Sequence, residues 1–226
     1  MKEPYSGDSM DEFVILVDGN DNPIGKEEKV KCHLPNGKLH RAFTALIFNK
    51  EGKLLLTRRS DSKMLWPGEW DGTVASHPRE GETYVSSAER RMPEEIGITC
   101  KMNYVNKFEY HVPYKDVGSE NEVCGTLIGV VDDFNESSLI KDEISEIKWI
   151  TSDELRLELQ NNRNIYCPWM VIALNFLDVY GSSEDGEKTG KKFQKLILNW
   201  TREELKQDYE KAIKHYIPDN NWRLVY

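Results

Sequence analysis

The sequence has no long apolar run, and this absence argues against a membrane protein. Its longest apolar stretches, such as Thr44–Phe48 and Val171–Leu174, fall far short of the about 20 residues that span a bilayer. The amino-terminal segment Met1–Asp11 is polar and acidic, unlike a secretory signal peptide or a basic transit peptide. We therefore expect no membrane span and no targeting segment.

The sequence also lacks paired cysteines and an excess of positive charge. Its four cysteines are scattered without a CxxC pair, which argues against a disulfide framework or a thiolate zinc site and favours the reducing cytoplasm. Thirty Lys and Arg against 39 Asp and Glu give a net charge of −9, so we expect no nucleic-acid partner, although a local basic pocket is compatible with this total. The length of 226 residues suits one large domain, or one domain with an appended element.

Apolar patterns and turn signals predict an α+β fold with a strand-rich centre. Strands are expected at Phe13–Asp18, Ala42–Asn49, Lys53–Thr57, Tyr104–Tyr110, Val123–Val131 and Glu146–Ile150. Apolar residues at helical spacing, followed by Gly97, predict a central helix over Thr83–Ile96, with a kink at Pro93. A short helix capped by Ser152-Asp153-Glu154 and a longer one from Pro168 through Val179 should follow.

The carboxyl-terminal part is predicted to be separate from this domain. Residues 181–192 contain no apolar side chain, so we interpret them as a mobile linker between a domain of residues 1–180 and a helical extension of residues 193–226. Thr201 and Glu204 have the spacing of a capping box at the start of a helix in that extension. Its apolar stripe consists of Leu205, Tyr209, Ala212 and Tyr216.

Three histidines and two glutamates could together bind one divalent cation. His33 and His40 flank a turn that contains Pro and Gly, and His77 precedes the central helix. Glu120 and Glu122 are two residues apart near a predicted strand, so their side chains can share one face. Imidazole and carboxylate ligands suit Mn²⁺, Mg²⁺ or Zn²⁺. The alternative is a set of surface histidines and a solvated acidic turn, because the sequence alone does not bring these residues together.

Charged residues on the central helix and in nearby loops form further candidate groups. Glu94 and Glu95, with Arg91, lie on or near one helical face, where carboxylates can hold the Mg²⁺ that recruits phosphate oxygens. The alternative is an ordinary charged helix with an Arg91–Glu95 pair worth only about 0.2–0.5 kcal/mol. Cations beside aromatic loops favour local anion binding, although each alone is an ordinary surface charge: Lys29, Arg58, Arg59 and Lys63.

The order and spacing of these motifs resemble the Nudix superfamily and, within it, the type 1 isopentenyl-diphosphate isomerases. Four residues occupy positions of the Nudix box, namely Glu82, Arg90, Glu94 and Glu95. Arg91 replaces a glutamate that ordinary Nudix hydrolases use on their metals, and the isomerase branch carries Arg at this position. Isomerase-like motifs are HRAF at 40–43, TRRSDSK at 57–63, WPGEW at 66–70, SHP at 76–78, ENEVC at 120–124 and PWM at 168–170. The resemblance covers about residues 12–180.

The resemblance implies a Nudix-like α/β/α sandwich with a mixed central sheet, and the interconversion of isopentenyl and dimethylallyl diphosphate. It implies that one divalent metal, Mn²⁺, Mg²⁺ or Zn²⁺, is held by His33, His40, His77, Glu120 and Glu122. An Mg²⁺ that accompanies the substrate diphosphate would be held by Glu95 and the main-chain oxygen of Ala75.

The resemblance also implies how the prenyl diphosphate is bound and protonated. The diphosphate would contact Lys29, Arg59, Lys63 and Arg91, and the hydrocarbon end would face Trp169. Glu122, relayed through Tyr110, would be the proton source.

One departure from the isomerase pattern concerns the second proton carrier. Ala75 stands where the family has a catalytic Cys, and an alanine cannot move a proton. Ser76, a water or the substrate diphosphate could replace that carrier, or the position could result from divergence or from a mutation that traps a complex. Two other functions therefore stay open: a Nudix-type diphosphate hydrolase or another prenyl-diphosphate enzyme, and an inactive prenyl-diphosphate binder. The sequence does not indicate the oligomeric state.

Overall fold

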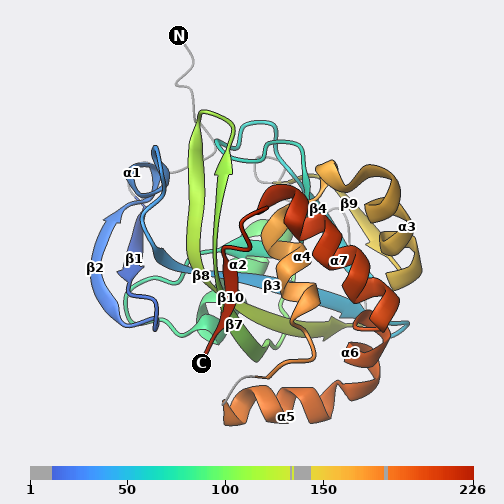
Figure 1. Ribbon diagram of the computed structural model, residues 1–226. Helices are drawn as coiled ribbons and strands as arrows, with labels where there is room; N and C mark the ends of the chain where they lie inside the picture. Colours follow the sequence, from blue (N-terminus) through green and yellow to red (C-terminus); the bar gives the residue numbers. More distant parts are fainter. Residues whose placement is uncertain (1–11, 133, 135–143, 181–182) are drawn as a thin grey trace.

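In the computed structural model, the chain forms one mixed sheet with a layer of helices on each of its two faces (Figure 1). The structure describes residues 12–132, 134, 144–180 and 183–226. The strands are β1 (Phe13–Val17), β2 (Pro23–Glu28), β3 (His40–Asn49), β4 (Leu54–Arg59), β5 (Trp70–Asp71), β6 (Val74–Ser76), β7 (Asn103–Tyr114), β8 (Gly118–Val131), β9 (Ile144–Ile150) and β10 (Trp222–Val225). The helices are α1 (Lys29–His33), α2 (Tyr84–Ile96), α3 (Ser152–Asn162), α4 (Pro168–Asn175), α5 (Glu184–Lys192), α6 (Gln194–Trp200) and α7 (Glu203–Tyr216), with a 3₁₀ turn at Arg163–Ile165.

The sheet has the order β10-β7-β8-β3-β1-β2 along its main path, and β4, β5, β6 and β9 branch from it. The pair β3–β8 is parallel, whereas the other strand pairs are antiparallel. The predicted mixed sheet of an α/β/α sandwich is therefore confirmed. Strands β2, β5, β6 and β10 and helix α1 are additions that the apolar patterns did not predict.

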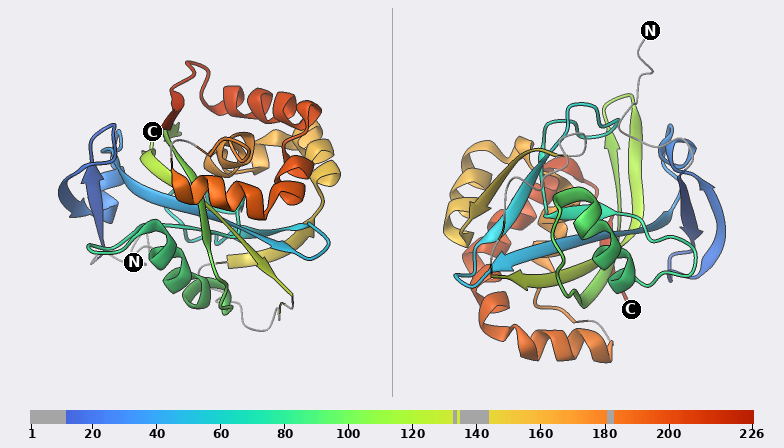
Figure 2. Two further views of the ribbon diagram at one scale, coloured as in Figure 1. Left: turned by 90° about the horizontal axis from the view of Figure 1, so that it is seen from below. Right: turned by 180° about the vertical axis from the view of Figure 1, so that it is seen from behind.

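Strand β3 lies between two hydrophobic cores because its side chains alternate between the faces of the sheet. Ala42, Leu46 and Phe48 belong to the core shared with α3, α4 and α7. Phe43, Ala45 and Ile47 belong to the smaller core covered by α2. Figure 2 shows α2 alone on one face and the carboxyl-terminal helices on the other.

Helix α2 forms where the apolar spacing predicts it. The Thr83 hydroxyl accepts from the backbone N–H of Ser86 in a capping box, and Gly97 ends the helix at a φ of 69°. Pro93 lies within the helix and does not end it. Helix α4 begins at Pro168 as predicted but ends at Asn175, before Val179. No helix of the described residues is both long and apolar enough to cross a bilayer.

The prediction of a mobile linker over residues 181–192 is wrong for Glu184–Lys192, which form helix α5; residues 181 and 182 lie outside the described residues. The stretch has no apolar side chain, but Gly186, Thr189 and Gly190 are buried. A Cβ atom at Gly186 would lie 2.3 Å from the carbonyl oxygen of Val105, and one at Gly190 would lie 2.4 Å from the Tyr180 ring. Glycine therefore creates a packing surface that a search for apolar residues does not detect.

We expect Gly186→Ala to lower the free energy of unfolding by about 1–3 kcal/mol, because the added methyl group overlaps the backbone of β7. In an unpacked helix the same change would stabilise by about 1 kcal/mol. Urea unfolding monitored by circular dichroism measures the difference, and Lys188→Ala on an exposed position of α5 is the matched control. Unchanged or increased stability of the Gly186 variant would contradict the packing of α5.

The carboxyl-terminal residues are joined to the main domain by helix packing and by the sheet. Leu205, Tyr209 and Ala212 of α7 are buried in the same core as α4. The predicted capping box is wrong, because Arg202 is the N-cap of α7 and the Thr201 hydroxyl donates to the carbonyl oxygen of Ile197 at 2.9 Å. Helix α6 ends immediately before this threonine, so the hydroxyl satisfies a carbonyl of α6 instead of an amide of α7.

Candidate functional site

One pocket collects side chains that lie far apart in the sequence, from Lys29 to Trp169. Three candidates of the sequence analysis do not line it, namely His40, Arg58 and Glu94. The candidates that line it are Lys29, His33, Arg59, Lys63, Ala75, His77, Arg91, Glu95, Tyr110, Glu120, Glu122 and Trp169. Apolar positions outside the quoted motifs also line it, among them Val30, Met64 and Leu65. Most of the predicted site residues therefore lie around one cavity.

The register of three strands places the acidic centre of this site. Glu122 on β8 pairs with His40 on β3 and with Tyr110 on β7. Because directly paired residues point to the same face, all three side chains converge below the pocket. His33 comes from the end of α1, and His77 follows β6.

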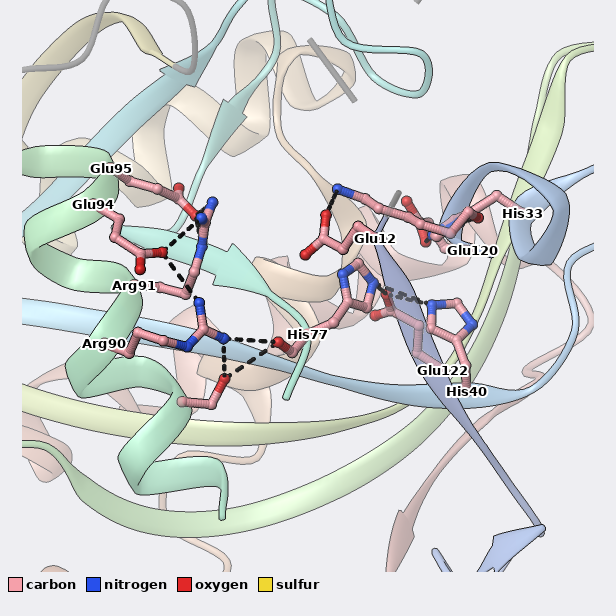
Figure 3. A network of polar contacts seen from close by, with 12 residues as sticks. Glu12, His33, His40, His77, Arg90, Arg91, Glu94, Glu95, Glu120 and Glu122 are labelled. Carbon is pink, nitrogen blue, oxygen red and sulfur yellow. Dashed lines mark hydrogen bonds and ion pairs between the residues drawn. The ribbon is translucent and has the colours of Figure 1, made fainter. Parts of the chain in front are cut away.

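The three imidazoles are oriented so that their Nε2 atoms face the centre (Figure 3). The Nδ1 atoms of His33 and His40 lie 2.6 and 2.8 Å from the carbonyl oxygens of Lys29 and Lys38, to which they donate. The Nε2 atoms of His40 and His77 are 3.2 Å apart, and that of His33 is 3.0 Å from Glu120 Oε2. With Nδ1 protonated, the Nε2 atoms of His33 and His40 carry lone pairs. These lone pairs face a Glu120 oxygen and the Nε2 atom of His77, respectively.

These facing acceptors fit a divalent cation. Two ligands at right angles around an ion at about 2.1 Å would be about 3 Å apart, close to the separations found here. One ligand atom each from His33, His40, His77 and Glu122 lies within 4.8 Å of the others. Glu120 Oε2 is buried and has no hydrogen-bond partner, because its contact with His33 lacks hydrogen-bond geometry. The residues present can therefore hold a divalent metal.

The electrostatic environment also favours a cation at the centre. Burial lowers the pKa of His77 well below its ordinary value, with further contributions from neighbouring positive charges, so the ring is neutral and its nitrogens can coordinate. Burial opposes ionisation of Glu122, but His40 and Tyr110 bring the pKa of Glu122 below its ordinary value. Burial likewise lowers the pKa of His40, yet contacts with Cys32 and Glu122 raise it well above its ordinary value, which indicates that positive charge is favoured there.

Tyr110 is the polar neighbour of this centre. Its hydroxyl donates to Glu122 Oε2 at 2.6 Å, and its side chain is buried. Burial and the negative charges of Glu122 and Glu120 raise the pKa of Tyr110 well above its ordinary value, so the phenol keeps its proton. A protonated phenol in contact with a carboxylate can take part in proton transfer.

The opposite wall of the pocket carries cations and carboxylates. Arg91 on α2 contacts Glu95 Oε1 at 2.9 and 2.5 Å and Glu94 Oε2 at 2.9 Å. Lys29 Nζ lies 3.0 Å from Glu12 Oε2. Figure 3 shows Glu12 between the helix α2 residues and the histidines. Burial opposes ionisation of Glu12, but the positive charges of Lys29 and Arg91 lower the pKa of its carboxyl to about 2.

Glu12 is a residue that the sequence analysis missed, because it stands alone before the first strand and belongs to no spaced motif. A second missed residue is Asp71 on β5, which contacts both Arg59 and Trp169. No spacing rule links a carboxylate in a short loop strand to residues at the end of β4 and the start of α4. Contacts of this kind depend on the tertiary fold.

Ala75 lies on β6 opposite Thr44 of β3 and lines the pocket. Val74 belongs to the core beneath α2, whereas Ala75 packs against the other core. Ser76 and His77, the next two residues, line the same pocket.

The family of the chain follows from comparison with known proteins. Residues 38–170 match the NUDIX domain family. A Haloarcula marismortui protein named isopentenyl-diphosphate Delta-isomerase is 37% identical over 183 residues, which cover 75% of this chain and 96% of that protein. A Photorhabdus laumondii protein named isopentenyl-diphosphate Delta-isomerase 2 is 37% identical over 168 residues, covering 74% of this chain and 93% of that protein.

A solved structure agrees at the level of the fold. A crystal structure from Deinococcus radiodurans matches with a TM-score of 0.53 and 22% identity, over 67% of this chain and 90% of that structure. The chain therefore belongs to the NUDIX domain family, in the branch whose members are named isopentenyl-diphosphate Delta-isomerase.

Proposed function

We propose that this protein interconverts isopentenyl diphosphate and dimethylallyl diphosphate. The observation that carries the proposal is the convergence of His33, His40, His77 and Glu122 with the buried Tyr110–Glu122 hydrogen bond, beside a pocket wall that contains cations. The names of the most similar relatives support the same reaction.

The reaction moves one proton on and another proton off the hydrocarbon. A proton adds to the terminal alkene carbon and leaves a tertiary carbocation, and loss of a proton from the neighbouring carbon gives the isomeric alkene. We infer that the Glu122–Tyr110 pair supplies the first proton: the Tyr110 hydroxyl donates to the ionised Glu122 at 2.6 Å, and Glu122 delivers to the alkene the proton that it takes up across this hydrogen bond. The His/Glu group would hold a divalent metal, Mn²⁺, Mg²⁺ or Zn²⁺, which would increase the acidity of a bound carboxyl group.

The pocket is suited to a short-lived cation. Trp169 is 3% exposed and packs edge to face against Trp66, with ring centroids 5.2 Å apart. The face of an indole stabilises a desolvated cation by about 2 kcal/mol or more. Apolar residues such as Met64 and Leu65 on the same pocket help to exclude water, which would otherwise trap the cation.

The diphosphate would be bound at the cationic side of the pocket by Lys29, Arg59, Lys63 and Arg91. Glu95 and Ala75 line the same pocket, and the Glu95 carboxylate and the main-chain oxygen of Ala75 would hold the Mg²⁺ that accompanies the diphosphate. In the free protein Lys29 pairs with Glu12, so the diphosphate would compete with this carboxylate for Lys29.

The second proton must reach an acceptor other than the side chain of Ala75. Ser76 lines the same pocket as Ala75 and is one candidate for this acceptor. A water and the substrate diphosphate are the other candidates. We also infer a cytoplasmic location, which is supported by four buried cysteines without disulfide bonds.

Incubation with isopentenyl diphosphate and Mg²⁺ in D₂O, followed by NMR, tests the proposal. We expect dimethylallyl diphosphate to form and deuterium to enter the substrate carbons that exchange protons. Release of phosphate or pyrophosphate without isomerisation would indicate a hydrolase. Binding without deuterium uptake or product would indicate an inactive binder, and either outcome would overturn the proposed reaction.

A further inference from the structure

A buried carboxylate lies behind the wall of the pocket and connects two of its residues. Asp71 is 3% exposed and does not line the pocket. Its Oδ1 accepts from Trp169 Nε1 at 2.7 Å and from the Gly72 amide at 2.6 Å. Its Oδ2 accepts from Arg59 Nη1 at 3.3 Å.

The two side chains that donate to Asp71 also contact each other. The Arg59 guanidinium carbon lies 5.3 Å from the centre of the Trp169 ring. Arg59 further donates to the carbonyl oxygens of Trp66 and Leu65 at 3.1 and 3.0 Å. Two carbonyl oxygens and the Asp71 carboxylate therefore fix the Arg59 guanidinium beside the indole.

A carboxylate has a chemical advantage over a neutral acceptor at this position. Burying a charge is costly unless it is paired and hydrogen-bonded, and Asp71 has Arg59 as its partner and accepts from two further N–H groups. A negative charge that accepts the indole N–H increases the electron density of the ring. It therefore strengthens the attraction between the ring face and a developing cation.

We propose that Asp71 is a positioning residue that fixes the indole of Trp169 and the guanidinium of Arg59, and that enhances cation stabilisation through the indole. This inference rests on the proposed isomerisation for its kinetic consequence, but not for the hydrogen bond itself. Asp71 reaches the substrate only through Trp169 and Arg59.

The titration of Asp71 provides a direct readout of the hydrogen bond. Burial raises the pKa of Asp71 to about 6, although Arg59, the Gly72 amide and Trp169 act in the opposite direction. Other titratable groups near Asp71 are Glu69, Cys124 and Cys167. The carboxyl is ionised above this pKa and protonated below it. The charge on the acceptor of the indole N–H is therefore lost as the pH falls through about 6.

The experiment follows the indole N–H signals of ¹⁵N-tryptophan-labelled protein from about pH 8 to about pH 5. Trp169→Phe identifies the signal of Trp169. We expect that signal to shift with a midpoint near pH 6 in the unmodified chain and to lose this titration in Asp71→Asn. Glu69→Gln is the matched control, because it neutralises the neighbouring carboxylate, whose pKa is raised to about 7 mainly by burial, and should leave the Trp169 titration in place.

Kinetics then test the consequence for the proposed reaction. In Asp71→Asn the amide oxygen can still accept from Trp169, while the amide nitrogen faces Arg59. We expect kcat/KM to fall about tenfold, the effect of losing one charged hydrogen bond, and to fall further in Asp71→Ala. A Trp169 signal that does not titrate, or that titrates equally in Asp71→Asn, would overturn the positioning role. A titrating signal in a chain without isomerase activity would overturn only the proposed function.

Discussion

Glu122→Gln is expected to lower kcat by about 10²–10⁴-fold, the usual contribution of a general acid–base group. Glutamine has nearly the same shape but cannot deliver a proton to the alkene. Its amide can still contact the Tyr110 hydroxyl that lies 2.6 Å from Glu122 in the native site. Steady-state kinetics with isopentenyl diphosphate measure the loss, and circular dichroism checks that the buried site still folds.

Glu120→Gln is the matched control for this prediction. Glu120 is on the same strand face and contacts His33, but Tyr110 donates to Glu122. If proton delivery belongs to Glu122, its variant loses far more kcat than the Glu120 variant at equal metal content. Equal losses in both variants would mean that these carboxylates act only as metal ligands. Undiminished kcat in Glu122→Gln would contradict its role altogether.

His40→Ala is expected to weaken divalent-metal binding by more than about 100-fold. Loss of a residue that only hydrogen-bonds to a metal ligand costs about 10–100-fold, and His40 would itself be a ligand. His40 is fully buried, and its Nε2 lies 3.2 Å from His77 and 3.4 Å from Glu122. When the imidazole is removed, a water molecule takes its place and binds the metal more weakly than the imidazole does. The metal content after dialysis, and the rise in melting temperature on addition of Mn²⁺, both measure the change.

His215→Ala is the matched control for the histidine variant, because His215 is exposed on α7 and outside the pocket. The control should retain the metal content and the Mn²⁺-dependent rise in melting temperature of the unmodified chain. Removal of metal with a chelator should lower the melting temperature of the control but have little effect on His40→Ala. An unmodified chain whose melting temperature does not respond to any divalent ion would contradict the metal site.

Much of the site could be predicted from the sequence because its residues occur in ordered, closely spaced motifs. The spacing of Glu120 and Glu122 places both on one strand face, and the pairing of Glu122 with His40 and Tyr110 completes the centre. That pairing is a property of the sheet and cannot be obtained from local periodicity. The metal identity and the roles of the individual residues stay predictions.

The misjudged parts share a physical cause, which is that tertiary contacts replace local signals. Helix α5 packs through glycines and not through apolar side chains, so it has the composition of a linker. Thr201 has the spacing of an N-cap but bonds to the preceding helix α6. Asp71 and Glu12 acquire their partners only through the folded chain.

Strand β10 has a consequence for folding during synthesis. It pairs Trp222 with Tyr110, so the proposed proton relay lies on a strand whose outer neighbour is translated much later. Until residues 222–225 leave the ribosome, β7 is an unprotected edge that can pair with other nascent chains. The proton-relay strand therefore acquires this hydrogen-bonded neighbour only after β10 has been translated, and long-range pairing of this kind forms slowly.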